Sequence, residues 1–340
     1  MTRKESVLLK KTEKLEKPVI LQAKNIKKYF PIKGGILKRT IGQLKAVDDI
    51  SFSVYEGETL GIVGESGSGK STLGRVLLRL LDPTEGQIIF NSVDISTLTN
   101  RDVRPFRKDM QIIFQDPFAS LNSKMSIEEL IEEPLLIQQN IPKQERRRKV
   151  IDMLEKVGLR ASDRMKYPHE FSGGQRQRIS IARALIMEPK FVICDEPVSA
   201  LDVSIQSQVL NLMKDLQDDL GLTYLFIAHD LSVIKHISDR VAVMYLGKFV
   251  ELASKETIYK QPLHPYTQAL LSAVPVIDIE NESPKREKII LKGDLPNPAD
   301  PPSGCAFRTR CPHVHDRCIS EQPDLVEIEP DHYVACHLYT

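Results

Sequence analysis

The sequence contains Gly64-Glu65-Ser66-Gly67-Ser68-Gly69-Lys70-Ser71-Thr72, whose first eight residues fit the phosphate-loop pattern G-x-x-x-x-G-K-[ST]. An apolar run at 60–63 predicts a strand before this loop, and the apolar spacing from Leu73 onward predicts a helix after it. The glycines let the backbone aim N–H groups at phosphate oxygens, and the helix N-terminus adds a favourable dipole. Lys70 supplies positive charge for the β- and γ-phosphates, and the Ser71 hydroxyl suits a Mg²⁺ ligand. A simple Gly/Ser turn would need neither this Lys-Ser pair nor the flanking elements, so we expect a nucleotide site.

Size and charge restrict the possible functions. The chain has 340 residues, enough for about two domains with a substantial core. Its formal net charge of +1 argues against a large nucleic-acid surface, so no nucleic-acid partner is expected. No apolar run approaches the ~18 residues of a membrane-spanning helix, and residues 1–17 lack the apolar stretch of a signal peptide. We therefore expect a cytosolic-type chain that would work at a membrane only by docking on another protein.

The N-terminal part is expected to form a leader and then a β layer. Residues 1–18 are predicted to be a flexible leader. Short β-like pieces between Val19 and Ser53 predict an antiparallel layer ahead of the P-loop strand. Tyr29 and Phe30 lie in this layer, where an aromatic ring can stack on adenine or pack in the core. From the residues alone, core packing is the favoured interpretation.

Two carboxylates follow a predicted buried strand. The run 191–194 is apolar throughout, as in a parallel strand covered on both faces, and it ends in Asp195 and Glu196. Paired carboxylates at such a position indicate a nearby cation or reactive water. One can reach the Mg²⁺ at Ser71 while its neighbour polarises a water, although a plain exit from the strand is the alternative.

Two further strands are also followed by polar residues. Gln115 comes after the apolar run 110–114, and His229 comes after 224–228. Ligands collect at the carboxyl ends of strands in α/β sheets, and a His there could contact a γ-phosphate. Considered alone, Gln115 would be an ordinary surface residue and His229 an ordinary structural one. The run 241–246 is predicted to close the sheet.

The residues from about 126 to 183 change to a helical period. The sequence 126–129 has capping-box form, and 142–157 reads as a helix that ends at Gly158. This predicts a helical subdomain. It ends in Ser172-Gly173-Gly174-Gln175, which is either a second phosphate-binding nest or an N-cap with turn glycines.

In this order, the motifs resemble those of the ATP-binding subunits of ABC transporters over roughly residues 19–255. The family's Walker A, Q-loop, signature, Walker B, D-loop and H-switch match 64–71, Gln115, 172–175, Asp195-Glu196, Ser199 to Asp202 and His229. The resemblance implies an α/β fold. Its parts would be a P-loop NTPase (RecA-like) core, an antiparallel β layer, a helical subdomain, and a small Cys-rich C-terminal extension at 256–340.

The resemblance also implies roles for these residues. ATP would lie between two subunits packed head to tail. It would contact Phe30 and residues 64–72 of one subunit, and Ser172, Gly173, Gly174, Gln175 and Asp202 of the other. Phe30 matches the adenine-stacking aromatic, although the family more often has Tyr there and Tyr29 stays possible. Mg²⁺ would be held by Ser71, Gln115 and Asp195. Glu196 would activate the attacking water, with His229 at the γ-phosphate and Gln115 completing the catalytic set.

A narrower resemblance, carried by 64–67, 114–122 and 264–275, is to the dipeptide/oligopeptide permease branch and its F-type ATPase subunits. It implies an ATPase, peripheral on the cytoplasmic side of the cell membrane, that energises peptide import by closing and opening its dimer. The implied partners are a D-type second ATPase subunit, two transmembrane permease subunits and, indirectly, an extracytoplasmic solute-binding protein. Import of nickel or another small solute is the alternative. A soluble ABC ATPase of DNA maintenance is a further one, although that class usually carries long coiled coils.

Four of the five cysteines lie in the last 36 residues, at Cys305, Cys311, Cys318 and Cys336. Four thiolates in a loop-rich tail can hold a tetrahedral ion or an iron–sulfur cube. Their spacing fits neither the common zinc pattern nor the ferredoxin pattern, so zinc, a cluster and unligated thiols all stay open. Resemblance to the permease branch implies a [4Fe-4S] cluster, with Zn²⁺ as the alternative. Cys194 reads as a small buried hydrophobe.

Overall fold

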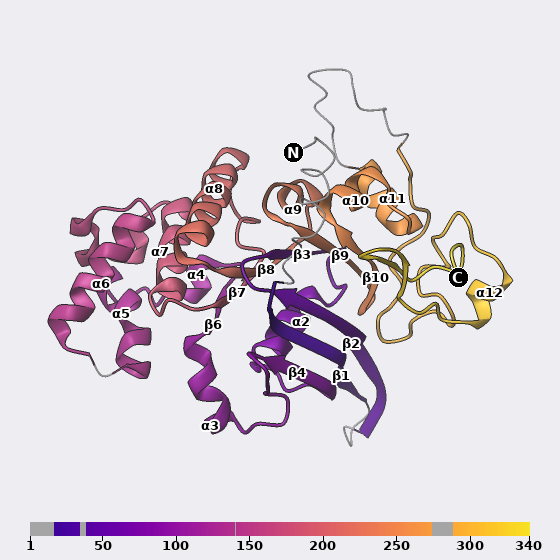
Figure 1. The fold of residues 1–340 in the computed structure, drawn as a ribbon, viewed down its shortest axis with the longest axis horizontal. Helices are drawn as coiled ribbons and strands as arrows, with labels where there is room; N and C mark the ends of the chain where they lie inside the picture. The colour runs from indigo at the N-terminus through magenta and orange to yellow at the C-terminus, as the bar shows by residue number, and fades with distance from the viewer. Residues whose placement is uncertain (1–16, 35–38, 140, 274–287) are drawn as a thin grey trace, which may run out of the picture.

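The computed structural model describes residues 17–34, 39–139, 141–273 and 288–340. They form two β-sheets with helices packed around them (Figure 1). Most of the predicted leader, and the end of the 264–275 stretch, lie outside the described residues. No helix in the described ranges is long and apolar enough to cross a membrane.

The strands are β1 (Val19–Gly34), β2 (Arg39–Tyr55), β3 (Thr59–Val63), β4 (Glu85–Phe90), β5 (Val93–Asp94), β6 (Met110–Ile113), β7 (Phe191–Asp195), β8 (Thr223–Ala228), β9 (Arg240–Tyr245), β10 (Lys248–Ser254), β11 (Val326–Glu329) and β12 (His332–Val334). The α-helices are α2 (Lys70–Leu77), α3 (Asn100–Val103), α4 (Pro117–Ser120), α5 (Ile127–Gln138), α6 (Lys143–Lys156), α7 (Gly173–Leu185), α8 (Val203–Leu220), α9 (Leu231–Ile237), α10 (Lys255–Lys260), α11 (Pro265–Ser272) and α12 (Asp316–Ser320). Short 3-10 helices cover Arg104–Lys108, Ala161–Met165 and Pro168–Glu170.

The larger sheet has the strand order β11-β12-β10-β9-β3-β8-β7-β6. Its central strands are parallel: β3 pairs with both β8 and β9, and β7 pairs with both β8 and β6. The carboxyl ends of these strands therefore share one edge, where ligands gather in α/β folds. The predicted α/β fold and the predicted central strands are confirmed.

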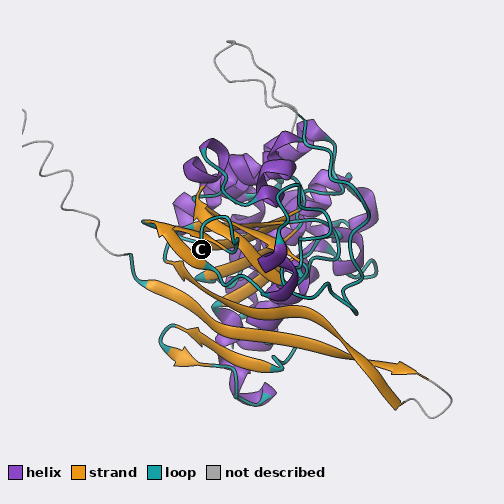
Figure 2. Cartoon of the chain, turned by 90° about the vertical axis from the view of Figure 1, so that its right-hand side faces the viewer, coloured by secondary structure: helices purple, strands orange, loops and turns teal. Residues whose placement is uncertain are grey.

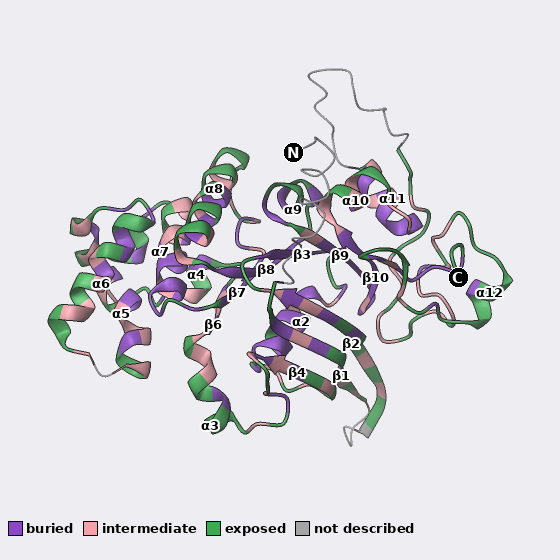
Figure 3. Cartoon of the chain, viewed as in Figure 1, coloured by how far each residue is buried: buried purple, intermediate pink, exposed green. Residues whose placement is uncertain are grey.

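Side chains of the central strands alternate between two hydrophobic clusters, which explains their unbroken apolar runs. In β8, Leu225 and Ile227 join the cluster that also contains Leu73 and Val76 of α2 and the antiparallel sheet. The alternate residues Tyr224, Phe226 and Ala228 join the cluster formed with α5 to α9. Both faces of the sheet are thus covered, and the exposed surface lies mainly on the outer helices and on the edges of the sheets (Figure 3).

The predicted antiparallel layer is confirmed as a four-stranded sheet with the order β2-β1-β4-β5. β1 and β2 form a long twisted ribbon whose pairing shifts register several times (Figure 2). Such bulges bend a ribbon and increase its twist. Gly247 donates its N–H to Ser68 O, and Asp48 donates its N–H to Gly247 O, both within hydrogen-bond distance (2.9 and 2.8 Å). The layer and the β9–β10 turn thereby support the P-loop.

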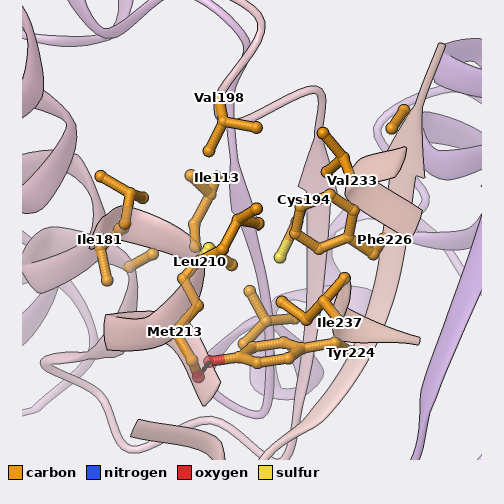
Figure 4. Packing of buried hydrophobic residues seen from close by; sticks show 14 of the residues in the cluster. Ile113, Ile181, Cys194, Val198, Leu210, Met213, Tyr224, Phe226, Val233 and Ile237 are labelled. Atoms are coloured by element: carbon orange, nitrogen blue, oxygen red, sulfur yellow. Dashed lines mark hydrogen bonds between the residues drawn. The ribbon is translucent and has the colours of Figure 1, made fainter. Parts of the chain in front are cut away.

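Cys194 is fully buried between the sheet and its helices, beside Phe226 and Ile113 of the neighbouring strands (Figure 4). Burial raises the pKa of its thiol well above the ordinary value. A neutral, enclosed thiol behaves as a small apolar side chain, so the prediction for Cys194 is confirmed.

The structure does not support the small Cys-rich C-terminal extension that we expected. β12 pairs antiparallel with β10, and β11 pairs with β12, so the chain's end extends the main sheet beyond β9. The prediction that 241–246 closes the sheet is therefore wrong. β9 is followed by β10. The other edge of β10 pairs with β12, which lies more than seventy positions later in the sequence.

A buried carboxylate in β10 holds the C-terminal part of the chain against the main sheet. Glu251 in β10 has no exposed surface and accepts hydrogen bonds from His332 Nε2 (2.8 Å), Leu263 N–H (2.7 Å) and His264 N–H (3.0 Å). His264 caps α11 by accepting the Tyr266 N–H at Nδ1 (3.0 Å). The pairing satisfies a group that would otherwise be costly to bury.

His264 should make stability depend on pH. Burial lowers its pKa from 6.5 to about 4, against the opposing charge of Glu251. The unfolded chain then binds a proton between those pH values that the folded chain does not. His264 therefore contributes about 3 kcal/mol to the free energy of unfolding above about pH 6.5, and this contribution is lost as the pH falls to about 4. Urea unfolding across this range should show the loss, and His264→Asn, which keeps a cap acceptor but cannot titrate, should abolish it. His236→Asn, at an exposed site, is the control; an equal change in both variants would contradict the assignment.

Candidate nucleotide-binding and hydrolysis site

The P-loop connects β3 to α2 and folds around the ammonium group of Lys70. Lys70 Nζ donates to Gly64 O (2.8 Å), Glu65 O (2.9 Å) and, at longer range, Ser68 Oγ (3.4 Å). The side chain is almost fully buried, and burial lowers its pKa while the nearby carboxylates, led by Glu196, oppose that shift. A cation held within the loop by two backbone carbonyls and a hydroxyl suits a polyanionic ligand.

Glycine is required at two positions of this loop. Gly69 has φ 104°, and a Cβ there would lie 2.0 Å from Ala46 O. A Cβ on Gly64 would lie 2.1 Å from Met244 O. The first glycine is needed for its backbone conformation and for space, the second for space. The antiparallel layer and β9 therefore set the shape of the loop from outside.

Ser71 and Asp195 meet at the carboxyl ends of β3 and β7. Ser71 Oγ donates to Asp195 Oδ1 (2.6 Å), and Arg75 Nη2 lies 3.9 Å from Asp195 Oδ2. Burial raises the pKa of Asp195, although the Ser71 hydrogen bond acts against it. One carboxylate and one hydroxyl, beside a phosphate-binding loop, are the donor set that Mg²⁺ uses when substrate phosphates and water complete its shell. The residues present fit Mg²⁺.

Glu196 is the point where three strand ends converge. Gln115, after β6, donates its amide Nε2 to Glu196 Oε2 (2.8 Å), and His229 Nδ1, after β8, lies 3.3 Å from the same oxygen. Glu196 has φ 49°, a left-handed conformation that is uncommon outside glycine and often found at functional sites. Its backbone is held there by the Glu196 N–H donating to Ile227 O (3.0 Å). The structure thus brings together three of the predicted catalytic residues.

A cavity of about 30 Å³ adjoins this convergence and is lined by Glu196, Ser199 and His229, among others. That is room for at least one water molecule. A larger cleft of about 540 Å³ lies between β1, β2, β10 and the C-terminal segment, and none of the predicted ATP residues lines it.

The Ser172–Gln175 segment begins α7 and lies away from the P-loop. Ser172 Oγ accepts the Gln175 N–H (3.4 Å), and Gln175 Oε1 accepts the Ser172 N–H (3.0 Å), so the segment is a capping box. A Cβ on Gly174 would lie 2.5 Å from Ile205 Cγ2, so the glycine also permits close packing on α8. Asp202 precedes α8 and is exposed. Among the described residues, no hydrogen bond or ion pair joins this segment to residues 64–72 of the same chain.

The two aromatic candidates for adenine have different surroundings. Tyr29 donates its hydroxyl to Asp48 Oδ1, and Lys45 Nζ lies 5.5 Å from its ring centroid. Phe30 is half-buried, with Lys28 Nζ 5.1 Å from its ring centroid. The Tyr29 hydroxyl is committed within the sheet, which leaves Phe30 as the less constrained ring. The stacking role stays a prediction.

The C-terminal cysteines do not support the predicted [4Fe-4S] cluster or its zinc alternative. Within the described parts of the chain, no group of three or more His, Cys, Asp or Glu side chains is placed to hold a metal ion. Burial, with smaller contributions from the other three thiols, raises the pKa of Cys305 to about 11. Burial also raises the pKa of Cys311 and Cys336.

Sequence reasoning missed a contact between the chain's end and the P-loop. Arg310 Nη1 lies 3.0 and 2.9 Å from the two carboxylate oxygens of Glu65, and Tyr266 Oη accepts the Glu65 N–H (3.0 Å). No local pattern marks Arg310, which lies 245 positions from its partner. Only the tertiary fold brings them together.

Two protein-family models match this chain. A family model described as "ABC transporter" matches residues 47–199, and one described as "Oligopeptide/dipeptide transporter, C-terminal region" matches 250–318. The oligopeptide transport ATP-binding protein AppF of Bacillus subtilis (strain 168) is 58% identical over 322 residues, covering 94% of this chain and 98% of that protein. The chain belongs to the oligopeptide/dipeptide branch of the ABC transporter ATP-binding subunits. The family resemblance is confirmed, and the protein is an ABC transporter ATPase.

Further relatives support this ABC transporter ATPase assignment. The dipeptide transport ATP-binding protein DppF of Haemophilus influenzae is 49% identical over 321 residues, covering 94% of this chain and 97% of that protein. Among solved structures, the ATP-binding cassette MJ0796 bound to ADP and Pi, described as a dimeric post-hydrolysis state, gives a TM-score of 0.62 at 27% identity. The matched region covers 69% of this chain and 98% of the MJ0796 chain.

Proposed function

We propose that this ABC transporter ATPase hydrolyses Mg-ATP at Glu196 and thereby drives import of di- or oligopeptides through two transmembrane permease subunits. The observation that carries the proposal is the hydrogen bond from Gln115 to Glu196 (2.8 Å). It connects the group best placed to activate water with the segment that leads into the helical part of the molecule.

Each residue of the site has a proposed task. Residues 64–72 bind the phosphates, with Lys70 as their counter-charge and Phe30 beside the adenine. Ser71 and Asp195, with Gln115, would hold Mg²⁺, which supplies charge neutralisation at the phosphates. Glu196 orients and deprotonates the attacking water, and His229 holds both Glu196 and the γ-phosphate in register.

We further propose that a second ATPase subunit completes the site. Ser172, Gly173, Gly174, Gln175 and Asp202 would contact the nucleotide held by the partner's P-loop. The exposure of Ser172 supports this role, because a helix N-terminus on an open surface offers N–H groups to an anion. Closure of such a dimer on ATP and its reopening after hydrolysis would be the power stroke.

The docking face for the membrane subunits is proposed to lie beside α4. Phe118 is 65% exposed only three residues after Gln115, and Arg176 of α7 stacks on its ring at 3.8 Å. Aromatic and arginine side chains are enriched at protein interfaces, which supports a docking role for this pair. Docking there would place the chain peripherally, on the cytoplasmic side of the membrane.

Peptide is proposed as the cargo because the relatives are named as oligopeptide and dipeptide transport proteins. The test is reconstitution of the chain in proteoliposomes with two transmembrane permease subunits, the second ATPase subunit and the solute-binding protein. Addition of a tri- or pentapeptide should raise ATP hydrolysis and load labelled peptide into the lumen. Stimulation by Ni²⁺ alone, or by DNA without membrane subunits, would contradict the peptide assignment in favour of the two alternatives.

A further inference from the structure

Glu65 is engaged at each of its polar groups. Its N–H donates to Tyr266 Oη (3.0 Å), its carbonyl accepts from Lys70 Nζ (2.9 Å), and its carboxylate accepts from Arg310 Nη1 at both oxygens. Two of these three partners come from the C-terminal part of the chain. The second residue of the P-loop is therefore positioned from outside the cassette.

Arg310 is itself fixed in place. It lies in the turn 305–311, where its N–H donates to Phe307 O (3.0 Å). Phe307 is 1% exposed and packs against Tyr245 and Tyr266, with ring centroids 5.3 and 5.4 Å apart. The Arg310 side chain is 10% exposed. The guanidinium is thus presented to Glu65 by a packed turn rather than by a free surface side chain.

The Glu65 carboxylate has a consequence for phosphate binding. Its charge is one of those that oppose the fall in the Lys70 pKa, so its field reaches the ammonium that should face the nucleotide phosphates. An uncompensated carboxylate at that position would repel a polyanion. The Arg310 pair is partly desolvated, so solvent screens it less than a surface pair.

We propose that Arg310 is a positioning residue for ATP binding: it neutralises Glu65 and holds the P-loop in the shape that accepts phosphates. The C-terminal segment then forms part of the nucleotide site, rather than an appendage to the cassette. This inference depends on ATP binding by the chain and is independent of what the transporter carries.

The test uses the full-length chain, Mg²⁺ and a fluorescent ATP analogue. Arg310→Met should raise the Kd on the order of tenfold, the loss expected when a charged hydrogen-bonded partner is removed. Adding Glu65→Gln to that variant should recover most of the loss, because the repelling carboxylate is gone. Arg308→Met is the matched control: Arg308 is in the same turn but donates to Ser303 O (2.7 Å). It should bind ATP within about twofold of the wild-type chain.

Each outcome decides the proposal. Wild-type affinity in Arg310→Met overturns it, and so does a loss that Glu65→Gln does not restore, since Arg310 would then act only by folding the tail. If Arg310→Met fails to fold, the double variant with Glu65→Gln decides the outcome. Folding of the double variant supports the role of Arg310 in neutralising Glu65, whereas a double variant that is also unfolded overturns it. These measurements involve neither peptide nor membrane subunits, so a failure of peptide import would leave their results unchanged.

Discussion

Replacing Glu196 with Gln is expected to lower the ATP turnover of the assembled transporter by about 10²–10⁴-fold while leaving ATP binding intact, which is the range typical of general-base catalysis. The amide keeps the size of the side chain and an acceptor for the Gln115 bond. It cannot take a proton from water. The variant should therefore accumulate ATP and a closed dimer, measurable as nucleotide retained by the assembled transporter with Mg-ATP.

The matched control is Glu188→Gln. Glu188 is another glutamate with positive φ (54°), paired with Lys149 Nζ at 3.2 Å on the surface of the helical part. Its loss should leave turnover within about twofold of wild type, because an exposed ion pair contributes little. Near-normal turnover in Glu196→Gln would remove Glu196 from the reaction, and an equal loss in both variants would point to stability instead.

Replacing Lys70 with Met should separate binding from stability. Methionine is similar in length but uncharged, and two or more charged hydrogen bonds to phosphate are lost, so the Kd for ATP should rise by at least about 100-fold. The free energy of unfolding should change by less than about 1 kcal/mol, because the relief of a buried charge offsets the lost loop contacts. Equilibrium binding and urea unfolding measure the two effects on the same sample.

For this second substitution the control is Lys149→Met, which removes a surface lysine of α6. Neither ATP affinity nor stability should change appreciably. Should Lys70→Met bind ATP within threefold of wild type, the ammonium would be a structural group of the loop. A large loss of stability would show instead that the loop collapses without it.

Much of the fold could be predicted because local patterns carry it. The run at 191–194 is apolar at every position, and the structure shows why: alternate side chains enter opposite hydrophobic clusters. The capping box at Ser126 is present with both of its hydrogen bonds. Periodicity and capping involve neighbours within a few residues, so the sequence reveals them directly.

The C-terminal segment could not be predicted in the same way. β12 is three residues long and its pairing partner β10 lies far away in sequence, so no local signal marks it as part of the main sheet. The cysteine spacing suggested a ligand set, but ligation depends on how the thiols are placed and charged. No group of side chains placed to hold a metal ion forms in the ranges that the structure describes.

The sequence by itself determined the chemistry of this ABC transporter ATPase: a phosphate loop around Lys70, a carboxylate pair after a buried strand, and the order of motifs that identifies the family. Tertiary structure alone decided which groups meet. Strand order brings Gln115 and His229 to Glu196, and docking of the chain's end brings Arg310 to Glu65. The physical reason is that a motif depends on short-range spacing, whereas a contact across hundreds of residues depends on how sheets and turns pack.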